Sequence, residues 1–156
     1  MKIMTNEIKT VETNEQVPAE FINHDFANEL TGVVERNTMF CSFEAVTPED
    51  KKKLFNAMNS SENALGDHIG ETIAVKDVFC ETVTIVREET GEKIIAPRIV
   101  LIDEKGNTYN STSFGIFNSL KKLMQVFGVP TWHEPVKVKV KQLNRNGNRV
   151  YTLEVV

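Results

Sequence analysis

The sequence predicts a mainly β fold with helices, and three observations lead to that fold class. Runs rich in valine and isoleucine recur from residue 72 to the end of the chain, separated by polar segments that contain glycine. Residues 114–127 change to the three- and four-residue spacing of an amphipathic helix. The chain has 156 residues, of which 40% are hydrophobic, so it can bury the core of a single domain.

Composition separates an N-terminal arm from this domain. Residues 1–20 contain no aromatic ring and few large apolar side chains, so we expect a flexible acidic arm. Residues 21–156 are expected to form one domain. Two cysteines without a Cys-x-x-Cys pair do not make a disulfide framework, and no apolar run reaches the ~18 residues of a membrane span. We therefore expect a cytoplasmic protein with no membrane partner.

The first elements of the domain are predicted to be a strand and a helix. Residues 38–46 combine aromatic and alternating apolar side chains, which is typical of a strand. Thr47 is suited to the N-cap of the following helix, and Pro48 to its first position. The apolar residues expected on the buried face of this helix are Leu54, Phe55 and Met58.

Three strands are expected next, at residues 72–86, 94–103 and 108–113. The first is long for one strand, which predicts a bulge or bend near Cys80 and Glu81. Each of the two connections contains a glycine, as tight turns require.

A helix and a final hairpin complete the pattern. Residues 114–127 form the predicted helix, with Ser113 at its N-cap and Gly128 at its C-terminal end. After a linker with two prolines, three valines alternate with Lys137, Lys139 and Lys141, which predicts a strand with one apolar and one cationic face. An Asn-Gly turn then leads into the last strand.

The order strand, strand, strand, helix, strand, strand is that of the OB-fold, a small five-stranded barrel. We place the barrel core at about residues 71–156, with residues 38–58 as an N-terminal strand–helix addition. A plain α+β sheet has the same order of elements and remains an alternative.

No pattern of catalytic or metal-binding residues is present in the sequence. It lacks the histidine and cysteine spacings of zinc sites, the Gly-x-Ser-x-Gly turn of hydrolases and a phosphate-binding glycine loop. We predict no cofactor, no metal and no enzymatic activity. A weaker alternative is a metal-dependent nuclease or recombination enzyme that uses the carboxylates of Asp77, Glu81 and Asp103.

The charge distribution instead favours binding to an anion. The net charge is −4, yet residues 114–156 contain seven basic and two acidic side chains. Proteins that bind single-stranded nucleic acid combine cations for the phosphates with aromatic rings on which bases stack. The residues expected to contact phosphate are Lys137, Lys139, Lys141, Arg145, Arg149 and Arg87. Those expected to stack on bases are Tyr109, Tyr151 and Phe79.

Each of these residue types also has a purely structural interpretation. Alternating lysines protect an exposed edge strand from pairing with other chains. Strand tyrosines are often half-buried, and a phenylalanine in a strand is often part of the core.

Two segments resemble a known family. Residues 99–113 (IVLIDEKGNTYNSTS) and 136–142 (VKVKVKQ) are similar to the small single-stranded DNA-binding proteins of bacteriophages that infect Gram-positive bacteria. The resemblance implies an OB-fold, no catalysis and non-sequence-specific protection of the strand displaced during phage DNA replication. It extends over about residues 71–156, and residues 35–58 are also similar to phage proteins of this kind. The positions that match individually are Tyr109, Lys137, Lys139 and Lys141.

The partners implied are single-stranded DNA and phage replication proteins. A protein–protein adaptor, such as a phage protein that antagonises a host enzyme, is the alternative within the same fold. The sequence leaves open whether the protein is a monomer or a dimer.

Overall fold

In a computed structural model, the described part of the chain is residues 39–59 and 62–156. The expected acidic arm of residues 1–20 lies outside it. In chain order the elements are β1 (Met39–Cys41), α2 (Pro48–Asn59), the short 3-10 helix η1 (Leu65–His68), β2 (Thr72–Val86), β3 (Lys93–Asp103), β4 (Thr108–Ser111), α3 (Phe114–Phe127), β5 (Val136–Arg145) and β6 (Asn148–Val155). The mainly β class and the order of elements are as predicted.

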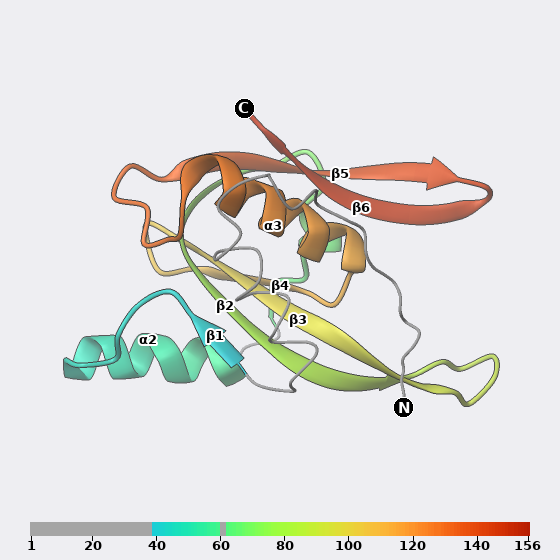
Figure 1. The fold of residues 1–156 in the computed structure, drawn as a ribbon, viewed down its shortest axis with the longest axis horizontal. Coiled ribbons are helices and arrows are strands. Elements are labelled where there is room, and N and C mark those ends of the chain that lie inside the picture. Colours follow the sequence, from blue (N-terminus) through green and yellow to red (C-terminus); the bar gives the residue numbers. More distant parts are fainter. Residues whose placement is uncertain (1–38, 60–61) are drawn as a thin grey trace.

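The six strands form one antiparallel sheet, in which the long strand β2 pairs with three other strands (Figure 1). The strand order is β4-β3-β2-β5-β6, and β1 also pairs with β2. The first residues of β2 pair with β5, and its central residues pair with β1 on the same edge. Strands β4 and β6 end this path, and no ladder joins them within residues 39–59 and 62–156.

A segment that the sequence patterns do not assign connects β4, at one end of the strand order, with β5. Asn63 accepts a hydrogen bond at its backbone oxygen from Asn110 N, 2.8 Å away in β4. Further along the same segment, Gly70 N donates to Val140 O of β5 at 2.9 Å. The region around η1 therefore bridges β4 and β5.

The irregularity in β2 lies earlier than predicted. The register with β3 shifts between Val75 and Asp77. The prediction of a bulge near Cys80 and Glu81 was therefore wrong. Because Lys76 is an extra residue, the alternation of side chains is reversed beyond it. Val75 faces the core before the bulge, and Cys80 faces it afterwards. The bulge lies where β2 stops pairing with β5, which is where the strand must bend.

The main core lies between the sheet and α3. It contains the inward side chains of β2, β3 and β5 together with the apolar face of α3. The Ser113 hydroxyl accepts hydrogen bonds from Gly115 N and Ile116 N, and Gly128, with a φ of +85°, follows the last turn. Both predicted ends of this helix are confirmed.

A second, smaller core lies beneath α2, on the other face of the sheet. Ala57 packs there with Phe79, Val100 and Ile102, and Leu54 lies beside them. The prediction of the buried face of α2 was wrong in part, because Phe55 is 63% exposed and Met58 is also exposed. The helix approaches the sheet through the small side chain of Ala57, which turns these two residues outward.

A buried carboxylate fixes the N-terminal addition to the sheet. Asp77 is 1% exposed and accepts hydrogen bonds from Lys53 Nζ at 2.5 Å, from Ser42 Oγ at 2.8 Å and from Thr131 Oγ1. Burial raises the pKa of Asp77, but the hydrogen bonds from these donors outweigh it and hold the pKa below its ordinary value. The Asp77 side chain, at the bulge in β2, thus links α2 to the α3–β5 linker.

We predict that Asp77→Asn lowers the free energy of unfolding by about 2 to 3 kcal/mol at neutral pH, because it leaves the Lys53 ammonium without its partner. A folded-state pKa below the unfolded value contributes stability above about pH 4, and this contribution is lost as the pH falls through the folded pKa. Urea titrations should therefore show the two proteins converging in acid. Asp67→Asn, at an exposed position, is the control and should change stability little. An Asp77→Asn variant as stable as the wild type would contradict the assignment.

Candidate nucleic-acid interface

Strand β5 has the cationic face that its sequence predicts. Its three alternate valines, beginning at Val136, are buried in the main core, so the intervening lysines lie on the outer face of the sheet. Lys137 and Lys141 are exposed and Lys139 is partly exposed. Alternate residues of a strand are about 6.8 Å apart, so the three lysines form a regular row. We call Lys137, Lys139 and Lys141 the lysine row.

The neighbours of the lysine row are mostly small and neutral. Lys137 lies opposite Ala74 of β2, and Lys139 lies between Thr72 of β2 and Glu154 of β6. Lys141 Nζ is 3.9 Å from Glu154 Oε1. Because both side chains of that pair are about half exposed, the ion pair contributes little and can open for another anion.

The predicted residues of the β5–β6 hairpin divide between its two faces. By alternation along β5, Arg145 lies on the face of the lysine row. Arg149 lies opposite Asn144, and Tyr151 lies opposite Gln142, which places both on the face of the buried valines. The hairpin therefore carries the lysines and Tyr151 on opposite faces.

Both tyrosines are half-buried and held by packing. A Cβ added to Gly66 would be 3.2 Å from the hydroxyl of Tyr151, which shows how closely the ring contacts this backbone. Tyr109 packs edge-to-face with His68, with ring centroids 5.2 Å apart. Burial raises the pKa of the Tyr109 hydroxyl, and the charges of Asp103 and Glu71 raise it further. Each ring packs against the main core and also keeps a partly exposed surface.

Two further predicted residues lie elsewhere. Phe79 is fully buried beneath α2, so its ring does not reach a base in this structure, and the stacking role expected for it is not supported. Arg87 is exposed where the β2–β3 loop begins. The β2–β3 and β5–β6 hairpins project to the same side of the molecule (Figure 1).

The carboxylates of the nuclease alternative already have other partners. The Asp77 carboxylate is bonded as described above, and Glu81 Oε2 accepts from Arg98 Nη1 at 3.1 Å. Asp103 accepts from the backbone N–H groups of Lys105 and Asn107 in the β3–β4 turn. In the described part of the chain, no three His, Cys, Asp or Glu side chains are grouped to hold a metal ion.

Comparison with known proteins shows to which family the chain belongs. A family model for phage single-stranded DNA-binding proteins matches residues 33–156. The chain belongs to this family. It is also 25% identical over 158 residues to a single-stranded DNA-binding protein of Bacillus phage GA-1, a match that covers 92% of this chain and 93% of that relative. No solved structure gives a significant match.

Membership in the phage single-stranded DNA-binding family confirms the resemblance found in the sequence. The matched region begins before β1 and includes α2, so the N-terminal addition belongs to the family domain as well. Among the described helices, none is long and apolar enough to cross a membrane.

We predict that Gly115→Ala lowers the free energy of unfolding by about 2 kcal/mol or more, because the new methyl group would be 2.0 Å from Tyr151 O and would push α3 away from β6. Thermal melting measures the loss. Asn118→Ala, at an exposed position in the same helix, is the control. Equal melting temperatures for Gly115→Ala and the wild type would show that this close approach does not position Tyr151.

Proposed function

We propose that this protein binds single-stranded DNA without sequence specificity and that the lysine row, extended by Arg145, contacts its phosphates. The observation that carries the proposal is a regular row of exposed and partly exposed lysines along one strand in a member of the phage single-stranded DNA-binding family. The row follows one strand, and an extended polynucleotide also has its phosphates at regular intervals. The negative net charge of the chain does not prevent this, because a local cationic row binds phosphate at short range.

The remaining predicted residues suggest a path around the end of the β5–β6 hairpin. Arg145 and Arg149 lie near its tip on opposite faces. We propose that the DNA follows the lysine row to the tip and bends around it, where Arg149 contacts phosphate and Tyr151 offers its exposed surface for stacking. Arg87, on the hairpin that projects to the same side, and Tyr109 of β4 are further contacts in this proposal.

The arrangement of strands supports an OB-type barrel as the scaffold. β2, β3, β4, α3, β5 and β6 follow the OB order, and β2 pairs with both β3 and β5 as the first strand of such a barrel does. We propose that the segment between Asn63 and Gly70 closes the barrel by bridging β4 and β5. Coating of the strand displaced during phage DNA replication in the host cytoplasm, without catalysis, is the biological role that fits this scaffold.

We expect the salt dependence of binding to identify the lysine row. Each cation on a phosphate contributes about −0.7 to the slope of log K against log salt, so the lysine row and Arg145 together account for about −2.8, which is about a 50-fold loss of affinity between about 50 and 200 mM salt. Replacing Lys137, Lys139 and Lys141 together with alanine should make the slope shallower by about 2.1 and this loss smaller by a factor of about 18. Fluorescence anisotropy of a labelled oligo-dT measures both slopes.

A matched control removes the same charge from elsewhere. Lys51, Lys52 and Lys122 are exposed lysines on α2 and α3, and none belongs to the β5–β6 hairpin. Their triple alanine variant should keep most of the wild-type slope. Equal slopes for the two triple variants would show that net charge, and not the lysine row, governs binding. Failure of the wild-type protein to bind oligo-dT would overturn the proposed function itself.

A further inference from the structure

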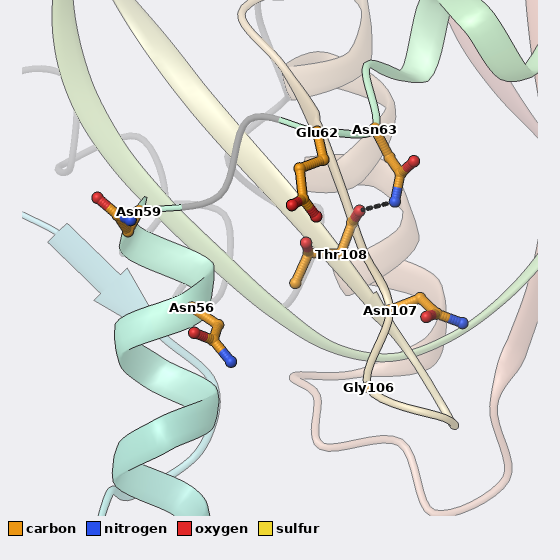
Figure 2. A pocket seen from close by; sticks show the side chains of 7 residues that line it. All are labelled: Asn56, Asn59, Glu62, Asn63, Gly106, Asn107 and Thr108. Atoms are coloured by element: carbon orange, nitrogen blue, oxygen red, sulfur yellow. Dashed lines mark hydrogen bonds between the residues drawn. The ribbon is translucent and has the colours of Figure 1, made fainter.

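A polar pocket lies between α2 and the β3–β4 turn, outside the surface described above (Figure 2). Its volume is about 480 Å³, which is large enough for a nucleoside. Amide groups dominate its lining, and no lysine or arginine belongs to it. The lining side chains used below are Asn56, Asn59, Glu62, Asn63, Asn107 and Thr108.

One wall of the pocket is fixed by internal hydrogen bonds, and the other is not. Asn63 Nδ2 donates to Thr108 O at 3.1 Å, and Asn107 Nδ2 donates to Asp103 Oδ2 at 3.0 Å. By contrast, the side chains of Asn56, Asn59 and Glu62 are exposed and make no hydrogen bond to any residue in the described ranges. Two amides and one carboxylate thus remain able to bind a polar ligand.

The electrostatics of the pocket disfavour phosphate. Glu62 carries a negative charge, and the C-terminal end of α2, which has no basic residue in its last turn, adds the negative end of the helix dipole. Arg98 does reach the Ala57 carbonyl of α2, but it is also bonded to Glu81. The pocket therefore favours a neutral group that donates N–H bonds.

The pocket is close to one end of the lysine row. Glu104 N, in the β3–β4 turn, donates to Ala74 O at 3.2 Å, and Ala74 lies opposite Lys137. The turn that forms one wall of the pocket is thus separated from the lysine row by the single strand β2. Helix α2 packs on the outer face of the sheet, the face that also carries the lysines.

We propose that this pocket receives one base of the bound DNA and prefers a base with an exocyclic amino group, cytosine or adenine, over thymine. This inference rests on the proposed function, because the lysine row must first place the strand beside the pocket. The cytosine amino group donates to a carboxylate such as Glu62, and adenine pairs with an asparagine amide through its amino group and N7. At the corresponding positions thymine offers an acceptor and a methyl group, and its only N–H donor is the ring N3, which two carbonyl oxygens flank. The protein thus binds DNA of every sequence but prefers cytosine or adenine at one nucleotide position.

The test compares oligo-dC with oligo-dT of equal length at neutral pH by fluorescence anisotropy. The wild-type protein should bind oligo-dC about fivefold more tightly, the ratio that one base contact gives. Glu62→Gln and Asn56→Ala should each reduce this ratio towards one, with the affinity for oligo-dT preserved. Glu88→Gln removes the same charge from the exposed β2–β3 loop and should keep the full ratio.

Two results would overturn the inference. One is equal affinity of the wild-type protein for both oligonucleotides, and the other is a preference for oligo-dC that Glu62→Gln leaves unchanged. Both leave the proposed function intact, since oligo-dT is still bound. Loss of binding to both oligonucleotides in the wild-type protein would instead contradict the proposed function.

Discussion

Strand β2 pairs with three other strands, and the extra residue at Lys76 allows it to do so. Before the bulge its inward side chains face the core together with those of β5, and after it they face the core together with those of β3. The same reversal places Asp77 and Phe79 on the outer face, where α2 covers them. The position of α2 and the course of the sheet therefore depend on one irregularity in one strand.

The lysine row depends on the pairing that this bend permits. The valines of β5 are buried because β5 lies between β2 and β6, and their burial fixes the lysines on the opposite face. A shift of one residue in this register would bury the lysines and expose the valines. The hydrophobic effect thus orients a row of charges that contributes little to stability itself.

Features set by residues close in sequence could be predicted. The capping of α3 by Ser113, the N-cap of α2, where Asp50 N donates to the Thr47 hydroxyl at 3.1 Å, and the alternation in β5 all depend on local side-chain chemistry. The position of the bulge could not be predicted from the sequence, because it depends on where β2 stops pairing with β5 and begins to pair with β1. The sequence left both burial and base stacking open for Phe79, since a strand pattern does not show which helix covers its outer face. The face on which each side chain of the β5–β6 hairpin lies depends on the register, in which Tyr151 is opposite Gln142 and therefore lies away from the lysines.

Lysine acetylation followed by mass spectrometry, with and without oligo-dT, tests most directly whether the outer face of β5 is the DNA-binding surface. We expect bound DNA to protect Lys137, Lys139 and Lys141 from the reagent, whereas Lys122 of α3 reacts as fast as in the free protein. Protection of Lys122 with full reactivity along β5 would contradict this assignment.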